Sequence, residues 1–398
     1  MSSFEESISS AVRDGILPGV MLYAKDKSGR LNYSKIISPG NSPHIPPLSA
    51  SATLFLASAT KLITTVSILQ LVERNLVTLD QDISHHVPAL ASQQILTGFS
   101  PSSGIPLLAP RKNPLTLRNL LTHSAGTAYD FLSPDKIQRW QALNNKTPVS
   151  GPSVDQRFAY PLLYEPGTAF AYSSGIDWAG AVLESLTSTD LETYVRENIF
   201  SPLGLTSFTF SRPRVAAEGN LWPMSARDPV TGKVVPHTGL DLNRGAESPI
   251  GGQGLYGRMD EYIQILGSLL LDDGRLLRPG TAASMFKPQL GEASKRSFLR
   301  TMEDPSWAIG DFPLTGEYDW GLGGLLVDGD AHAYRKRGTL IWGGAPNIFW
   351  WIDRGTGLTG LFGTQIMPSG EKVTKNFIKA FEDEMYERVK ALELGEEQ

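Results

Sequence analysis

The chain has 398 residues, of which 41% are hydrophobic and 19% charged, and its formal net charge is −5. These values are typical of a globular protein with a sizeable core and roughly two or three structural units. The weakly acidic balance and the lack of Lys/Arg runs argue against nucleic acid as a partner.

Three further features concern the compartment. The sequence contains no cysteine, which excludes disulfides, thiolate metal sites and a cysteine nucleophile. The N-terminus carries early acidic residues and no apolar core, so it does not resemble a signal peptide. The sequence also lacks an uncharged apolar run of about 18 residues, the length that a membrane span requires. We therefore expect a cytoplasmic protein without membrane contact.

The N-terminal part of the chain predicts a hairpin followed by a core helix. An amphipathic helix is expected over residues 4–14, and strands at 20–24 and 31–37 are joined by a Ser-Gly turn. A loop rich in Pro and Ser then leads to the stretch 54–75. This stretch is apolar around nearly its whole circumference, as expected of a buried helix.

The middle of the chain predicts helices separated by loops. Helical patterns occur at residues 116–122, 176–186, 191–199 and 259–271, whereas residues 97–114, 142–168 and 211–248 are expected to be irregular. Strand patterns return at residues 320–327, 333–341, 347–353 and 358–364, and an amphipathic helix closes the chain at 373–392.

Strands at both chain ends, with helices between them, indicate an α+β fold with one antiparallel sheet. We expect residues 1–75 and 290–398 to form the sheet domain, which includes the core helix. Residues 76–289 are expected to form a mostly helical insert.

Ser58 and Lys61 stand three residues apart at the predicted start of the core helix. Side chains at this spacing share one helix face, so a hydroxyl and an amine can exchange a proton. The helix N-terminus supplies unpaired N–H groups and a partial positive charge, which favour a developing oxyanion. This pattern predicts a serine acyl enzyme. The alternative is that Ser58 only caps the helix and Lys61 is solvated, and the S-x-x-K spacing recurs at Ser133, Ser284 and Ser369.

Such a pair needs a third proton-transferring group and two N–H donors for the oxyanion. Tyr172 is a candidate for the first role, since it lies just ahead of a predicted helix among small residues. The segment Trp342-Gly343-Gly344-Ala345 is a candidate for the second, because two residues without side chains let backbone approach a ligand.

These three motifs, which we call boxes, follow one another as they do in the serine β-lactamase and penicillin-binding superfamily. The sequence resembles that superfamily, and within it the class C-like esterases and acyltransferases. The matching boxes are Ser58-Ala-Thr-Lys61, Tyr172-Ser-Ser174 and Trp342-Gly-Gly344. The phrases LASATKL, LRNLLTHSAG, DWAG, GGQGLYG and GGAPNIFW resemble most closely fungal enzymes that move or remove the 2-methylbutyryl side chain of lovastatin-type statins.

The resemblance implies a β-lactamase/transpeptidase-like fold and a set of roles. Ser58 would be the nucleophile, Lys61 and Tyr172 would activate it, and the N–H groups of Ser58 and Ala345 would form the oxyanion hole. Substrate would contact residues in and around the last two boxes and nearby aromatic side chains. These predicted contacts are Trp342, Gly343, Gly344, Ser174, Tyr129, Phe131 and Tyr256.

Two departures from the family pattern indicate the substrate. Trp342 stands where penicillin-binding enzymes place a cation for a carboxylate, and Ser174 stands where they place an amide. Both changes favour a neutral, apolar ester over a β-lactam or peptide. His123 is expected to be structural, and no cofactor or metal is expected.

Three functions stay open at this point. The first is a hydrolase that passes the acyl group to water. The second is an acyltransferase that passes it to an alcohol, with an acyl carrier protein as one candidate donor. Esterase and transferase share their first step. The third is a non-catalytic sensor on the same fold.

Overall fold

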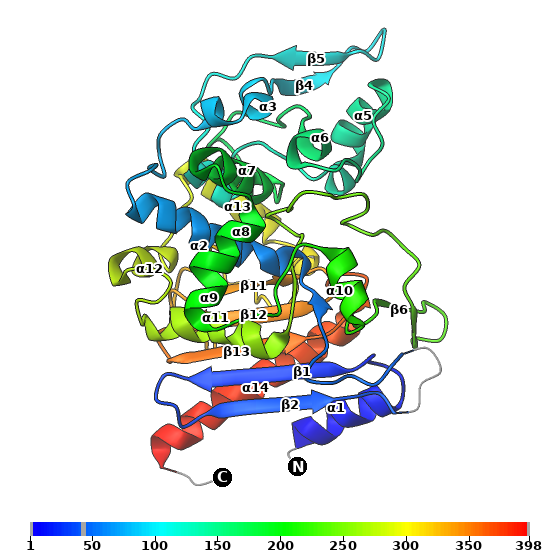
Figure 1. Ribbon diagram of the computed structural model, residues 1–398, viewed down its shortest axis with the longest axis vertical. Helices are drawn as coiled ribbons and strands as arrows, with labels where there is room; N and C mark the ends of the chain where they lie inside the picture. The colour runs from blue at the N-terminus through cyan, green and yellow to red at the C-terminus, as the bar shows by residue number, and fades with distance from the viewer. Residues whose placement is uncertain (1–2, 41–44, 396–398) are drawn as a thin grey trace.

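A seven-stranded antiparallel sheet forms the lower part of the molecule in Figure 1. The computed structural model describes residues 3–40 and 45–395. Within these ranges the strand order of the sheet is β2-β1-β13-β12-β11-β10-β9. Its strands are β1 (Val20–Asp26), β2 (Asn32–Ile37), β9 (Tyr318–Trp320), β10 (Leu325–Val327), β11 (Leu340–Gly344), β12 (Ile348–Asp353) and β13 (Leu358–Gly363).

Strands from the two ends of the chain pair with each other in this sheet, as its second and third strands. β1, from the N-terminal hairpin, pairs antiparallel with β13, and Tyr23 faces Leu361 in that register. All residues of β12 and β13 are buried, as expected of strands covered on both faces. The prediction of an α+β, β-lactamase/transpeptidase-like fold with a sheet from both chain ends is confirmed.

Helices cover the sheet and build the upper part of the molecule (Figure 1). Among the described helices, none combines the length and the apolar composition that a bilayer crossing requires. The α-helices are α1 (Ser3–Arg13), α2 (Thr60–Glu73), α3 (Pro88–Ala91), α4 (Leu117–Leu121), α5 (Arg139–Leu143), α6 (Val154–Phe158), α7 (Gly175–Thr187), α8 (Leu191–Val195), α9 (Ser201–Leu203), α10 (Arg212–Glu218), α11 (Met259–Leu271), α12 (Pro279–Met285), α13 (Glu292–Thr301) and α14 (Lys372–Leu394).

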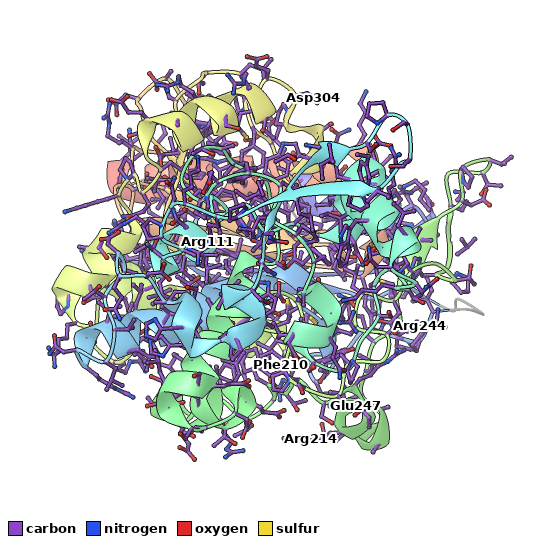
Figure 2. The ribbon with its side chains drawn as sticks, turned by 90° about the horizontal axis from the view of Figure 1, so that it is seen from above. Arg111, Phe210, Arg214, Arg244, Glu247 and Asp304 are labelled. Carbon is purple, nitrogen blue, oxygen red and sulfur yellow. The ribbon has the colours of Figure 1, made fainter. Side chains whose placement is uncertain are left out.

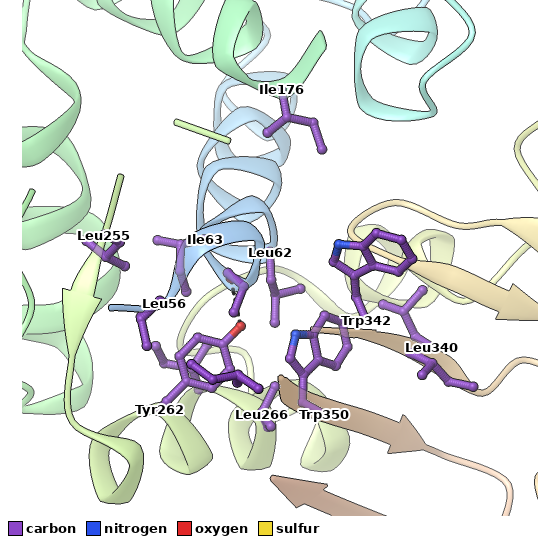
Figure 3. Packing of buried hydrophobic residues seen from close by; sticks show 14 of the residues in the cluster. Leu56, Leu62, Ile63, Ile176, Leu255, Tyr262, Leu266, Leu340, Trp342 and Trp350 are labelled. Atoms are coloured by element: carbon purple, nitrogen blue, oxygen red, sulfur yellow. Dashed lines mark hydrogen bonds between the residues drawn. The ribbon is translucent and has the colours of Figure 1, made fainter. Parts of the chain in front are cut away.

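Two neighbouring tryptophans of β12 show how the sheet is covered, because successive side chains of a strand point to opposite faces. The ring of Trp351 packs against Phe381 and Tyr386 of α14. Trp350 lies beside Leu266 of α11 in Figure 3. The amphipathic C-terminal helix therefore covers one face, and α11 covers the other.

α2 is the predicted core helix. Leu62 and Ile63, in its first turn, lie above Tyr262 and Trp350 in Figure 3, and each is fully buried. Tyr262 donates its hydroxyl to the Ala59 carbonyl at 2.8 Å. The start of α2 is thereby fixed against α11 and the sheet.

The middle of the chain contains strands that the sequence did not predict. β4 (Ile95–Phe99) and β5 (Pro106–Ala109) form a hairpin where residues 97–114 were expected to be irregular, so that expectation is wrong. The Gly, Pro and Ser residues that suggested a loop are concentrated in its turn. Further short elements lie in the region 211–248, namely α10, β6 (Ser225–Arg227) and β7 (Val234–Pro236), and β14 (Ile366–Met367) pairs with β6.

Two predicted C-terminal strands have the wrong limits. The single strand expected at 320–327 is the hairpin of β9 and β10. Its turn contains Gly321 and Gly324, where a Cβ would overlap neighbouring backbone. The strand expected at 333–341 begins only at Leu340. The preceding segment instead directs Arg335 into the core, where its side chain is paired.

The expected division into a sheet domain and a helical insert stays a prediction. α11 falls inside the range assigned to the insert, residues 76–289, and yet it contacts β1, β12 and β13. The helices that pack on α2, such as α7 and α8, come from the same range. The insert and the sheet domain therefore share packing surfaces.

Arg335 and Glu382 form an ion pair in which both side chains are fully buried. The guanidinium donates to the two carboxylate oxygens at 2.6 and 2.5 Å, and to the Asp311 carbonyl at 2.7 Å. We expect Glu382→Leu to lower the free energy of unfolding by about 3–5 kcal/mol, because it leaves a buried cation without its partner. Urea denaturation followed by circular dichroism measures this change.

The control is the double variant Arg335→Met/Glu382→Leu, which removes both charges. It should be clearly more stable than the single variant, since no uncompensated charge remains. Equal losses in the two variants would contradict the assignment of the effect to the buried cation.

Candidate active site

Ser58 lies in a tight turn at the start of the central helix. Ala57–Ala59 form a 3₁₀ turn, and the regular helix begins at Thr60 rather than at Ser58. Ala57 has a φ of +45°, which is uncommon for a residue with a side chain. Thr60 Oγ1 donates to the Ala57 carbonyl at 2.6 Å and accepts from the N–H of Leu255 at 3.1 Å. These bonds hold the turn and present Ser58 at its apex.

Two side chains reach the Ser58 hydroxyl. Tyr172 donates its OH to Ser58 Oγ at 2.7 Å, and Lys61 Nζ lies 3.4 Å from the same oxygen. Lys61 is only 1% exposed. The N-cap positions of the turn and of the helix belong to Leu56 and Ala59. The alternative of a capping Ser58 with a solvated Lys61 is therefore wrong.

Tyr172 comes from the segment that precedes α7, and aromatic rings surround it. Its ring centroid lies 4.6 Å from that of His123 and 5.1 Å from that of Trp342. Burial, and then the charge of Lys61, hold the pKa of His123 well below its usual value, so a neutral imidazole stands behind Tyr172. His123 supports the phenol rather than reaching Ser58, in line with its predicted structural role.

Lys61 is held by two further acceptors. Its Nζ donates to the OH of Tyr129 at 2.9 Å and to the carbonyl of Gly252 at 2.7 Å. Tyr129 in turn donates to Asp177 Oδ2 at 2.7 Å, and the N–H of Gly252 donates to Asp177 Oδ1 at 2.8 Å. The amine of Lys61 is therefore tied through two residues to one buried carboxylate.

Asp177 and Gly252 had no predicted role. Burial raises the pKa of Asp177, while Lys61 and the hydrogen bonds from Tyr129 and Gly252 oppose that rise. Burial also raises the pKa of Tyr129 well above its usual value, so this phenol keeps its proton. An acidic residue in an otherwise apolar first helical turn, Gly-Ile-Asp-Trp, is the signal that could have identified Asp177.

The end of β11 lies against the turn that carries Ser58. A Cβ on Gly344 would overlap the carbonyl oxygen of Leu56, and a Cβ on Gly343 would overlap the carbonyl of Ile348. Only glycine allows this approach at either position. The residue that follows, Ala345, is thereby placed beside the turn that carries Ser58, where the predicted oxyanion-hole donor would have to lie.

A cavity of about 540 Å³ adjoins this end of β11 and includes Ala345 in its wall. Tyr256, a predicted substrate contact, lines it, and the ring of Phe55 lies 5.2 Å from that of Tyr256. Most of the remaining wall is apolar. It includes Leu221, Trp222, Pro223, Met224, Pro236, Leu240, Leu242, Pro346 and Met367.

A second cavity of about 310 Å³ shares Arg212 and Tyr256 with the first. Phe210 and Glu247, labelled in Figure 2, lie on its wall. Arg212 pairs with Asp241, which lines only the first cavity. The two cavities therefore adjoin at a neutralised ion pair.

Some of the predicted substrate contacts lie elsewhere. Ser174 is fully buried and donates its hydroxyl to the Ala128 carbonyl at 2.8 Å. Tyr129 is 1% exposed and faces Lys61. Phe131 stacks on Tyr129 with the ring centroids 5.1 Å apart. The structure thus brings Tyr129 to the amine and leaves Ser174 in the packing beneath the site.

Trp342 stands next to the phenol of Tyr172 within an aromatic cluster. Its ring lies 4.7 Å from that of Trp320 and 5.8 Å from that of Trp307. This surrounding offers a substrate apolar contact and no charge. Ser58, Lys61, Tyr172 and Trp342 are not in the wall of the 540 Å³ cavity, which reaches this region through Ala345. A hydroxyl between an amine and a phenol, in apolar surroundings, is suited to acyl transfer from a neutral ester.

The fold and this constellation define a serine acyl enzyme of the β-lactamase and transpeptidase type. The sequence matches the family described as Beta-lactamase over residues 29–383, and the chain belongs to that family. Within the superfamily it is one of the serine esterases and acyltransferases.

Several fungal relatives match over most of their length. The chain is 35% identical to lovastatin esterase of Penicillium rubens, over 97% of this chain and 98% of the relative. It is 34% identical to monacolin J acid methylbutanoyltransferase of Aspergillus terreus, over 96% and 94%. A solved structure of a mutant simvastatin synthase from Aspergillus terreus superposes with a TM-score of 0.88 at 35% identity, covering 97% of this chain and 94% of that chain.

Proposed function

We propose that the protein cleaves a carboxylic ester through an acyl-Ser58 intermediate. Ser58 Oγ attacks the ester carbonyl while its proton passes to Lys61. The C–O bond to the alcohol breaks, and the alcohol leaves with a proton delivered through Tyr172. The N–H groups of Ser58 and Ala345 are the proposed donors to the oxyanion. The observation that carries this proposal is the Ser58 hydroxyl, 2.7 Å from Tyr172 OH and 3.4 Å from Lys61 Nζ.

The proposed substrate is a statin-like polyketide ester with a short branched acyl group of the 2-methylbutyryl type. The names of the two fungal relatives, an esterase of lovastatin and a methylbutanoyltransferase, support this choice. The largely apolar wall of the 540 Å³ cavity supports it as well. Trp342 adds an apolar surface beside Tyr172, where a carboxylate-binding cation is not needed.

The favoured acceptor in the second step is water, which makes the protein a hydrolase. The second candidate is transfer to an alcohol, and it is favoured by the 34% identity to a methylbutanoyltransferase. An acyl carrier protein is then the proposed acyl donor. A cytoplasmic location belongs to the same proposal.

Intact mass spectrometry with lovastatin, with and without its deacylated alcohol, tests these alternatives. A hydrolase releases free 2-methylbutyric acid continuously in water alone. A transferase accumulates acyl-enzyme that clears only when the alcohol is added. A protein that is acylated once and does not turn over with either acceptor would instead be a sensor.

A further inference from the structure

Asp177 is a buried carboxylate whose hydrogen bonds lead to the proposed general base. It lies in the first turn of α7 and is fully buried. One carboxylate oxygen accepts from Tyr129 at 2.7 Å and the other from the N–H of Gly252 at 2.8 Å. Both donors also contact Lys61 through their oxygens. Two separate bridges therefore connect Asp177 to the same amine.

The backbone at Gly252 is shaped around this carboxylate. A Cβ at position 252 would overlap the carboxylate of Asp177, so only glycine allows the contact. The preceding residue, Gly251, is fixed to the central helix, because its carbonyl accepts from Thr64 Oγ1 at 2.6 Å. The loop is thus tied to α2 on one side and to Asp177 on the other.

We propose that Asp177 is a positioning residue for the reaction, which acts through Tyr129 and Gly252 to direct the lone pair of Lys61 toward Ser58. The proposal rests on the proposed function, in which Ser58 is the nucleophile and Lys61 receives its proton. Asp177 itself contacts neither Ser58 nor substrate in this scheme.

The hydrogen-bond donors and acceptors around Lys61 fix the direction of its lone pair. Tyr129 has one hydroxyl proton and donates it to Asp177, so toward Lys61 its oxygen can only accept. The Gly252 carbonyl can also only accept. A neutral Lys61 amine has two N–H groups and one lone pair, and the two N–H groups are used by these two acceptors. The lone pair is left for the remaining neighbour, Ser58 Oγ.

An amide at position 177 would reverse the direction of the hydrogen bonds between residue 177, Tyr129 and Lys61. The NH₂ group of Asn can donate to the Tyr129 oxygen, which frees the phenolic proton to point at Lys61. That proton would compete with Ser58 for the lone pair. Asn also removes the negative charge while keeping the size of the side chain, so the protonated amine loses a stabilising counter-charge.

Four other titratable residues lie near Lys61 and Asp177. Tyr172 faces Lys61 from the segment before α7, with Nζ 4.8 Å from its ring centroid, and His123 also lies within the field of Lys61. Arg157 and Tyr160 interact electrostatically with Asp177. Asp130 also acts electrostatically on Arg157 and Tyr160, but Asp177 is the carboxylate that the two bridges connect to Lys61. Its removal therefore leaves Lys61 with less negative charge nearby.

The test measures the pH dependence of Ser58 labelling by an alkyl fluorophosphonate. In this reaction the Ser58 O–P bond forms, the P–F bond breaks, fluoride leaves and the Ser58 proton passes to Lys61. We expect Asp177→Asn to lower the labelling rate by about 10²-fold, as expected for a misdirected base. The acid-side fall in labelling should move to lower pH, because the protonated amine loses the stabilising charge of the carboxylate.

The matched control is Ser67→Ala, which removes another buried polar group of α2. The Ser67 hydroxyl bonds only within the helix, to the Ile63 carbonyl at 2.9 Å, so rate and pH profile should stay those of the wild type. With an ester substrate, Asp177→Asn should lower kcat and leave KM nearly unchanged. Should this variant fail to fold, Tyr129→Phe breaks one bridge and should shift rate and pH profile in the same directions.

Several outcomes would overturn the inference. A folded Asp177→Asn protein with the wild-type rate and pH profile would do so, and so would a rise in KM alone, which indicates only a packing role. If neither Asp177→Asn nor Tyr129→Phe changes the pH profile of labelling, the bridge from Asp177 through Tyr129 does not direct the lone pair of Lys61. A wild-type protein that is not labelled at Ser58 would overturn the proposed function, and this inference with it.

Discussion

Replacing Ser58 by alanine is expected to lower kcat by roughly 10⁴-fold or more, as loss of the nucleophile does in other serine enzymes. The half-buried Ser58 hydroxyl accepts one short hydrogen bond, from Tyr172, so its removal should affect folding little. The measurement combines ester turnover with intact mass spectrometry. No acyl adduct should form on the variant, and its melting temperature should stay near that of the wild type.

Ser284→Ala is the matched control for this variant. Ser284 also begins an S-x-x-K sequence, but it lies in α12, where its hydroxyl donates to the Thr281 carbonyl at 2.7 Å. Its removal should leave turnover at the wild-type level. Retention of most activity by the Ser58 variant would show that the acyl group is carried elsewhere.

The placement of Ser58, Lys61 and Tyr172 could be predicted because each belongs to a short motif with strong local context. An apolar lead-in and a buried helix distinguish Ser58 from the other serines with the same spacing. Tyr172 lies 114 positions along the chain from Ser58, and no local pattern brings it there. Its recognition depended on the order of the motifs and on the family resemblance.

The roles of Tyr129 and Ser174 were harder to predict, because a sequence does not show which way a side chain faces. Tyr129 was assigned to the substrate wall as one aromatic among many, whereas its hydroxyl binds Lys61. Ser174 occupies the last position of the Tyr-x-Ser box and turns instead toward the Ala128 carbonyl. Asp177 was missed because a lone acidic residue at a helix start is usually solvated.

The parts of the fold that were predicted wrongly also depend on contacts that a sequence does not show. α14 and α1 have one apolar face, so their positions followed from periodicity alone. The β9–β10 hairpin and the late start of β11 depend on contacts with distant residues. Gly321 approaches the Met285 carbonyl, and Arg335 turns inward only because Glu382 on α14 receives it. Neither partner is visible within a local window of sequence.

Lys61 gives the second large expected effect. Its amine is the basic group in contact with Ser58. It also donates to Tyr129 and Gly252, the two residues that connect it to Asp177. Methionine has a similar length and no charge, so it fills the space without offering a lone pair of comparable basicity. Asp177 keeps its bonds from Tyr129 and Gly252 in that variant.

We therefore expect Lys61→Met to lower kcat by roughly 10³-fold, the contribution of a well-placed general base, and to slow fluorophosphonate labelling of Ser58 by a similar factor. Lys61→Arg separates charge from basicity, because a guanidinium keeps the cation and does not lose its proton in proteins. Both variants should be equally impaired if Lys61 accepts the Ser58 proton. High activity in the arginine variant would mean that the site needs only a positive charge, and Tyr172 would then have to accept the proton.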